Sequence, residues 1–284
     1  MKPIRKVLVV TKRPAFLDLP KRFRRRGHPL TRHSRLALTE HQKTLAAIRN
    51  VLKHARVSST FQNRVNLGAI RKFDLILTVG GDGTLLKTSH RISNQPVLGI
   101  NSSPSTSVGA LCSLRGDHVG EQLPSILAGR YHLRPLNRLE IRVNGHRVPF
   151  LALNDLLFCN KSPGATSRYL IRIGRREEEQ RSSGVWISTA AGSTAAIYAA
   201  GGRKLNLSSR KFQYLVREPF RPVSIRGYRL RKGVLSGENS LHLVSKMAHA
   251  SLFIDGLHGF VPLSFGDSVD IALGGPRLNL AEPI

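Results

Sequence analysis

One carboxylate lies within a run of glycines in this chain, in the segment Gly80-Gly81-Asp82-Gly83-Thr84. Glycines allow the backbone to turn abruptly and to approach a ligand closely. A helix that begins at such a turn offers free N–H groups and the positive end of its dipole to a phosphate. Among these donors, the Asp82 carboxylate is suited to accept a proton from an attacking hydroxyl. The segment predicts phosphate chemistry with Asp82 as general base, although Gly-Asp-Gly also occurs in ordinary tight turns.

Two further segments combine small and polar side chains in a way that suits a nucleotide. Residues 182–196 lead from a predicted strand through small residues into a predicted helix that begins near Ser193 and Thr194. Hydroxyl and helix N–H groups suit phosphate or ribose there. The pair Asn154-Asp155 precedes another predicted strand, and its amide and carboxylate suit an adenine or ribose edge. Taken alone, the first segment is equally typical of a capped helix packed on a sheet, and the second is more typical of a turn.

The glycine segment matches neither of the two common nucleotide-binding motifs. Leu86 stands where the dinucleotide-binding fingerprint requires a third glycine, and Leu86 again precedes Lys87 where a P-loop has glycine. A protein-bound metal is not expected, because the chain has two distant cysteines, Cys112 and Cys159, and no His-Glu-x-x-His pattern. The sequence therefore does not favour the enzyme classes that depend on those motifs.

The glycine segment must be positioned by the alternating elements around it. Short strands are predicted at residues 7–10, 60–65, 73–79 and 96–100, with helices at 31–54 and 84–91. The strand at 73–79 is almost continuously apolar, which indicates burial on both faces. This alternation predicts an α/β domain with a parallel sheet, with Asp82 at the carboxyl end of a strand, where open α/β sheets bind ligands.

From about residue 130 the pattern changes to short strands separated by turns. They are predicted at residues 139–143, 147–151, 156–159, 169–173, 185–188, 241–244, 251–254 and 269–273. One helix, at 193–200, is closed by Gly201-Gly202. We predict an α/β domain over residues 1–114 and a mostly antiparallel all-β domain over 115–284. The second domain contains one helix at the ligand site, and its C-terminal tail packs back on the first domain.

Together the three segments resemble the NAD kinase family, whose members carry a Gly-Gly-Asp-Gly-Thr motif, an Asn-Glu pair and a Gly-Ser-Thr-Ala segment in this order. The resemblance covers residues 7–272, and 101–112, 217–219 and 254–256 are similar to the mitochondrial-type branch. It implies a kinase that phosphorylates the 2′-hydroxyl of the adenosine ribose of NAD, or of NADH, with ATP or another nucleoside triphosphate. The product is NADP, Mg²⁺ accompanies ATP, and a homo-oligomer is expected.

The resemblance also implies roles for individual residues. Asp82 corresponds to the base that takes the proton from the ribose hydroxyl. The implied nucleotide-binding residues are Gly80, Gly81, Gly83, Thr84, Lys87, Asn154, Asp155, Ser183, Ala191, Ser193, Thr194 and Ala195. Three positions depart from the family pattern. Asp155 replaces a glutamate, Ser183 stands where many members have an aspartate, and Ala196 replaces a tyrosine.

The chain carries 45 Lys and Arg against 17 Asp and Glu, a formal net charge of +28. A nucleic-acid-binding protein is therefore one alternative. The sequence contains no helix-turn-helix, zinc-finger or ribonucleoprotein pattern, and aromatic residues make up 6% of it, so only non-specific nucleic-acid binding is expected. The basic segment at residues 21–26 is predicted to be a surface loop. A lipid kinase of the diacylglycerol or sphingosine type, which shares the glycine motif, is the other alternative.

Two features bear on where the protein works. No apolar run approaches the roughly 20 residues that a membrane span requires, so no integral membrane protein is expected. The apolar residues 7–10 indicate a buried strand instead of a leader, and two cysteines without a partner pattern suit a reducing compartment. We predict a cytoplasmic location.

Overall fold

The computed structural model describes residues 2–12, 31–220, 227–256 and 258–284. The chain divides into two compact units: unit 1 comprises residues 1–135 and 278–284, and unit 2 comprises residues 136–277. The division follows Pro135 instead of Leu114, because helix α4 (Val119–Leu127) and strand β6 (Tyr131–Leu136) build on the first sheet. The last strand, β19 (Leu278–Pro283), also joins unit 1, where it pairs with β4 (Pro96–Asn101).

Unit 1 is built on a seven-stranded sheet in the order β2-β1-β3-β4-β19-β6, with β5 beside β4. Its remaining strands are β1 (Lys6–Thr11), β2 (Ser58–Asn63), β3 (Leu75–Gly80) and β5 (Leu114–Arg115). The pairings of β1 with β2 and β3, and of β4 with β3 and β19, are all parallel. Every residue of β3 is buried, as its apolar sequence indicated. The predicted α/β domain with a parallel sheet is confirmed.

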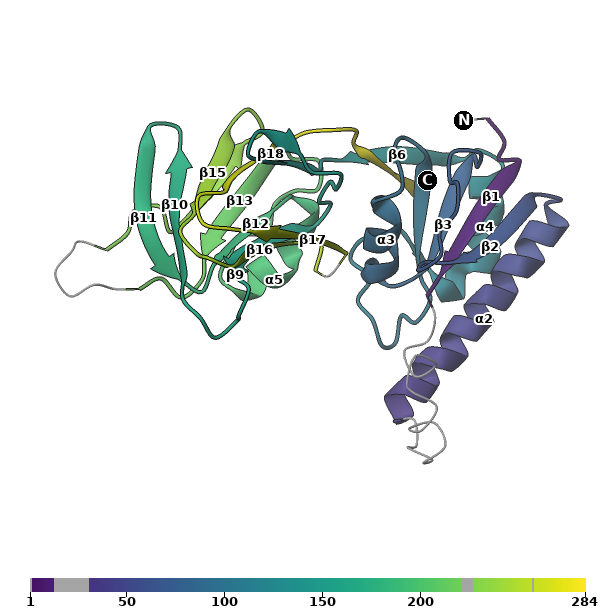
Figure 1. Ribbon diagram of the computed structural model, residues 1–284. Coiled ribbons are helices and arrows are strands. Elements are labelled where there is room, and N and C mark those ends of the chain that lie inside the picture. Colours follow the sequence, from purple (N-terminus) through teal and green to yellow (C-terminus); the bar gives the residue numbers. More distant parts are fainter. Residues whose placement is uncertain (1, 13–30, 221–226, 257) are drawn as a thin grey trace. The chain divides into compact units, whose positions relative to one another are not determined.

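Helices α2 (Arg32–His54) and α3 (Asp82–Ser89) lie on opposite faces of this sheet (Figure 1). The chain crosses from β1 to β2 in one direction and from β3 to β4 in the other, and right-handed crossovers then place the two helices on opposite sides. A short 3₁₀ turn, η2 (Gly116–His118), leads into α4, which packs with α2 over the same core.

The buried side of α2 does not follow its apolar residues alone. Leu36 is 45% exposed, whereas the polar residues His41 and Thr44 are buried. The reason is the loop after β4, which covers this part of the helix. The His41 Nδ1 atom lies 2.8 Å from the Ser102 hydroxyl oxygen, and Thr44 bonds the carbonyls of Glu40 and Ser102.

Unit 2 consists of two six-stranded antiparallel sheets, in the orders β11-β10-β15-β18-β7-β8 and β14-β13-β12-β9-β16-β17. The first contains β7 (Leu139–Val143), β8 (His146–Arg147), β10 (Ser167–Ile173), β11 (Arg176–Ser182), β15 (Ser240–Ser245) and β18 (Ser268–Leu273). The second contains β9 (Asp155–Asn160), β12 (Val185–Ser188), β13 (Lys211–Val216), β14 (Lys232–Ser236), β16 (Ala250–Ile254) and β17 (Gly259–Leu263). Both sheets contribute to one core, in which Phe158 and Tyr169 meet edge to face at 5.7 Å. The predicted antiparallel domain is confirmed.

Two predicted elements of unit 2 are shorter in the structure. The prediction of one continuous helix over residues 193–200 was wrong. The structure has a 3₁₀ turn, η3 (Ala191–Thr194), and a single helical turn, α5 (Ala196–Ala199), separated at Ala195, whose ψ of −141° is not helical. Gly201 closes the second turn at φ +97°, as the Gly-Gly signal indicated. The return strand predicted over 147–151 is limited to β8 and one bridge from Ala152 to Leu139.

Candidate active site

The glycine segment lies where β3 passes into α3, and two of its glycines are required by close neighbours. A Cβ on Gly80 would collide with the Thr84 hydroxyl oxygen, and one on Gly81 would lie 2.8 Å from the Ser107 hydroxyl oxygen. Gly81 caps the helix without a side-chain hydrogen bond, so the first N–H groups of α3 have no side-chain cap. The turn is therefore tight because the loop after β4 packs directly against it.

Asp82 is the first residue of α3, and its carboxylate is held by that same loop. The backbone N–H groups of Ala110 and Leu111 donate to Oδ2 at 2.9 Å and Oδ1 at 2.8 Å. The Cys112 thiol lies 3.9 Å from Oδ1, and burial and the nearby Asp82 raise its pKa to about 12, so it stays a neutral donor. An ionised carboxylate has about four acceptor sites, so Asp82 keeps capacity for a substrate hydroxyl while its orientation is fixed.

The other predicted residues of this segment are placed differently. Thr84 is buried with its backbone N–H bonded to the Gly81 carbonyl at 2.9 Å, whereas Gly83 is partly exposed. Lys87 is partly exposed in the last turn of α3. Five residues along a helix correspond to a rotation of about 140° and a rise of about 7.5 Å, so the structure does not bring Lys87 beside Asp82.

In unit 2, the pair Asn154-Asp155 is held by a carboxylate a hundred residues away. The buried Asp255 accepts backbone N–H groups from Leu153 at 3.0 Å, Asn154 at 2.7 Å and Asp155 at 3.1 Å. The Asp255 N–H returns a bond to the Asp155 carbonyl at 2.9 Å. Three donors on one carboxylate fix the backbone from which the Asn154 and Asp155 side chains project.

Asp155 and Asp255 are both buried, and the charge of Asp255 acts on the Asp155 carboxyl group. Burial, and after it the charge of Asp255, raise the pKa of Asp155 from 3.8 to about 7. Arg138 is buried nearby, and burial lowers its pKa to about 10 while the Asp255 charge acts in the opposite sense. Arg138 therefore stays protonated at neutral pH and supplies a counter-charge to Asp255.

The small-residue segment packs against the same pair. A Cβ on Gly192 would overlap the Asn154 carbonyl, so only glycine permits this approach. The Thr189 N–H donates to the Asn154 carbonyl at 3.0 Å, and its hydroxyl donates to the Leu153 carbonyl at 2.6 Å and accepts the Gly192 N–H at 3.1 Å. The structure thus brings together two sequence segments that were predicted independently.

Residues of this segment differ in what they offer a ligand. Ser193 is fully buried, and its hydroxyl donates to the Ala190 carbonyl and accepts the Leu205 N–H, so it holds the fold. Ala191 is also buried, whereas Thr194 is exposed and Ala195 is partly exposed. Thr194 and Ala195 are therefore the members of this group that present atoms to solvent.

Ser183 lies away from Asn154, Asp155 and the small-residue segment. It precedes β12, whereas Ser188 at the far end of that strand pairs with Asp155. Its backbone N–H bonds the Arg217 carbonyl at 3.0 Å. Ala196, the other departure from the family pattern, is exposed at the start of α5.

Asp255 holds the backbone of the Asn154-Asp155 pair, but the sequence patterns assign it no role. It lies within residues 254–256, one of the segments that resemble the mitochondrial-type branch. Its φ of +47° and the following Gly256 at +73° mark a sharp turn, which Asp-Gly indicates in sequence. No local signal, however, connects this turn with residues 153–155.

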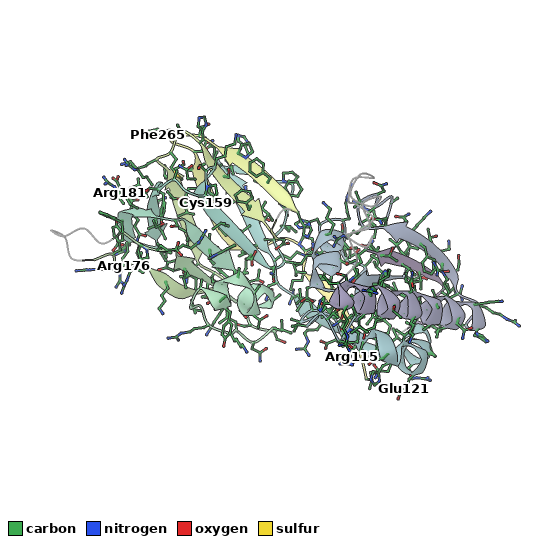
Figure 2. All side chains as sticks on the ribbon, turned by 90° about the horizontal axis from the view of Figure 1, so that it is seen from below. Arg115, Glu121, Cys159, Arg176, Arg181 and Phe265 are labelled. Atoms are coloured by element: carbon green, nitrogen blue, oxygen red, sulfur yellow. The ribbon has the colours of Figure 1, made fainter. Side chains whose placement is uncertain are left out.

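Many of the positively charged side chains are exposed. Arg176 and Arg181 project outward from β11 (Figure 2). The predicted basic loop at 21–26 lies outside the described residues. Within the described ranges, no three His, Cys, Asp or Glu side chains form a group that could hold a metal ion. None of the described helices is long and apolar enough to span a membrane.

Comparison with known proteins shows which family this chain resembles. Residues 28–131 match the family model described as the ATP-NAD kinase N-terminal domain. A probable NADH kinase of Oryza sativa subsp. japonica is 31% identical over 266 residues, which cover 86% of this chain and 82% of that protein.

Two solved structures share the fold. An NAD kinase from Archaeoglobus fulgidus, solved in complex with ATP, aligns with a TM-score of 0.68 at 20% identity over 97% of this chain and 92% of its own. Yeast NADH kinase, solved with NADH, aligns with a TM-score of 0.73 at 17% identity over 99% of this chain and 84% of its own. At these identities, the two alignments establish the architecture of the chain over nearly its whole length.

Proposed function

The chain belongs to the NAD kinase family, and from this membership we propose that it transfers the γ-phosphoryl group of ATP to the 2′-hydroxyl of the adenosine ribose of NAD or NADH. Similarity to a probable NADH kinase supports the reduced dinucleotide as a second acceptor. The observation that carries the proposal is the Asp82 carboxylate, fixed at the end of a buried strand by two backbone N–H groups with acceptor capacity left over.

In the proposed step, Asp82 accepts the proton of the ribose 2′-hydroxyl as that oxygen forms a bond to the γ-phosphorus. The bond from the γ-phosphorus to the bridging oxygen of ADP breaks, so ADP leaves with the electron pair and the dinucleotide gains one phosphoryl group. A carboxylate that cannot rotate needs no reorganisation before the proton moves. General-base assistance of this kind contributes about 10² to 10⁴-fold to a rate.

We assign dinucleotide binding to unit 2. Asn154 and Asp155 supply an amide and a carboxyl group from a backbone held by Asp255, and Thr194 and Ala195 supply an accessible hydroxyl and backbone groups. Asp155 has a pKa of about 7, so near neutral pH it exists both as a hydrogen-bond donor and as an acceptor. Near neutral pH, Asp155 thus carries less than one full negative charge.

Four finer features complete the proposal. Mg²⁺ accompanies the triphosphate as part of the substrate. The product feeds the cell's supply of NADP. The enzyme is a cytoplasmic homo-oligomer of the mitochondrial-type branch. Nucleic acid binds only non-specifically, through the net charge of +28.

The test is to incubate the purified protein with MgATP and either NAD or NADH and to detect NADP or NADPH by an NADP-specific dehydrogenase. Parallel reactions contain diacylglycerol or sphingosine as acceptor, because those lipid kinases share the glycine motif. We expect the phosphorylated dinucleotide and no lipid phosphate. Lipid phosphorylation without NADP or NADPH would overturn the proposal.

A further inference from the structure

Two positively charged residues that have no role so far lie at the glycine segment of unit 1. Lys12 directly follows β1, and its backbone N–H donates to the Val79 carbonyl at 3.3 Å, next to Gly80. Arg64 directly follows β2, and its N–H donates to the Thr11 carbonyl at 3.0 Å. Both backbones are therefore fixed at the carboxyl ends of neighbouring parallel strands, the same edge from which Asp82 begins α3.

Their side chains reach the two sides of the glycine turn. The Lys12 Cδ atom lies 3.5 Å from the point that a Cβ of Gly80 would occupy, and the Arg64 Nη1 atom lies 3.7 Å from the corresponding point at Gly83. The two cations also interact with each other. Burial first, and the Arg64 charge second, lower the pKa of Lys12. The two cationic side chains therefore lie against the glycine turn.

Two neighbouring positive charges at this turn are electrostatically unfavourable unless an anion binds beside them. Of the described residues, no acidic side chain comes within 4.0 Å of Lys12 or Arg64 to form an ion pair. The Thr84 hydroxyl, which lies against Gly80, is buried and has no hydrogen-bond partner among the described residues. Two like charges and an unused hydroxyl next to free helix N–H groups form a site that favours a multiply charged oxyanion.

We propose that Lys12 and Arg64 bind the terminal phosphates of the triphosphate donor over the Gly80–Thr84 turn. The inference rests on the proposed kinase function. A lysine contributes a compact charge and an arginine a planar fork that can contact two phosphate oxygens. The diphosphate of NAD has the same chemistry, but the γ-phosphate must lie next to the hydroxyl that Asp82 deprotonates. A donor site at this turn meets that requirement directly.

The experiment measures binding of the phosphate donor and of the dinucleotide acceptor separately. Lys12→Met and Arg64→Gln remove one charge each, and Lys12→Arg keeps the charge. Lys6→Met and Arg71→Gln are matched controls, because Lys6 is exposed at the opposite end of β1 and Arg71 is exposed before β3. Steady-state kinetics give KM for ATP and for NAD, and calorimetry gives the affinity for inorganic tripolyphosphate in the absence of NAD.

Loss of one charged hydrogen bond to phosphate corresponds to about tenfold or more in affinity. We expect Lys12→Met and Arg64→Gln to raise KM for ATP and weaken tripolyphosphate binding by about this factor, with KM for NAD changed less than about twofold. Lys12→Arg and both controls should bind tripolyphosphate within about twofold of the unaltered chain, which separates lost charge from lost structure.

Three other results are informative. An increase in KM for NAD alone would overturn the inference and assign the cations to the NAD diphosphate. Equal tripolyphosphate affinity in all variants would also overturn it and leave the kinase proposal intact. Charge-dependent tripolyphosphate binding by a protein that forms no NADP would support the phosphate site and refute the proposed function.

Discussion

Replacing Asp82 with asparagine tests the proposed mechanism, and the structure shows that this change does more than remove a base. Both carboxylate oxygens accept backbone N–H groups, from Ala110 at 2.9 Å and Leu111 at 2.8 Å. In Asp82→Asn, the new amide nitrogen replaces one of these oxygens and faces an N–H donor. One hydrogen bond is lost and the other becomes weaker, because its acceptor is no longer charged.

These contacts set the expected magnitudes. Loss of a charge-assisted hydrogen bond should lower the free energy of unfolding by about 1–3 kcal/mol. Loss of the general base should lower kcat by at least about 100-fold. Affinity for NAD, measured by calorimetry, should stay within about tenfold, since the groups that we assign to NAD binding belong to unit 2. Urea titration, steady-state kinetics and calorimetry measure the three effects separately.

Gly109→Ala is the matched control for loop damage. Gly109 has a φ of +61°, and a Cβ there would lie 2.6 Å from the Asn101 Nδ2 atom, so alanine disturbs the same loop while Asp82 stays intact. We expect a comparable loss of stability but a loss of kcat below about tenfold. If Gly109→Ala reduces kcat as much as Asp82→Asn does, Asp82 acts by holding the loop. Near-normal kcat in Asp82→Asn would refute the role as base.

Three further predictions concern buried groups. Asp255→Asn should raise KM for NAD by about tenfold or more with a smaller change in KM for ATP, because the Asn154-Asp155 backbone loses charged acceptors; equal changes in both KM values would contradict this. Because the native pKa of Asp155 is about 7 instead of 3.8, the stability of the unaltered chain relative to Asp155→Asn should fall by up to roughly 4 kcal/mol between pH 4 and pH 7. Burial, and after it Lys12, lower the pKa of His41 from 6.5 to about 4, so stability relative to His41→Gln should fall by up to about 3 kcal/mol as the pH decreases from 6.5 to 4. Urea titrations across each pH range check the last two predictions, and a pH-independent difference would contradict them.

Local sequence patterns determined the type of most elements. The apolar run before Gly80 predicted a buried strand, and the doubled glycine predicted a tight turn into a helix; the structure has both. The strand over 185–188 matches β12 residue for residue. These predictions succeed because side-chain periodicity and glycine conformational freedom act within a few residues.

Contacts between distant residues were decided only by the tertiary structure. Asp82 accepts backbone N–H groups from residues 110–111, and Asp255 accepts them from residues 153–155. Every residue except proline has such a group, so no side-chain type in the sequence identifies these partners. Burial on α2 likewise depended on the loop after β4, which covers His41 and leaves Leu36 exposed. The pairing of β19 with β4, and the approach of Lys12 and Arg64 to the glycine turn, follow from strand order. The sequence by itself predicted Asp82, Asn154 and Asp155 as candidate site residues. The packing of distant segments decided how they are held and placed Lys12 and Arg64 at the glycine turn, because backbone partners and strand order leave no local pattern.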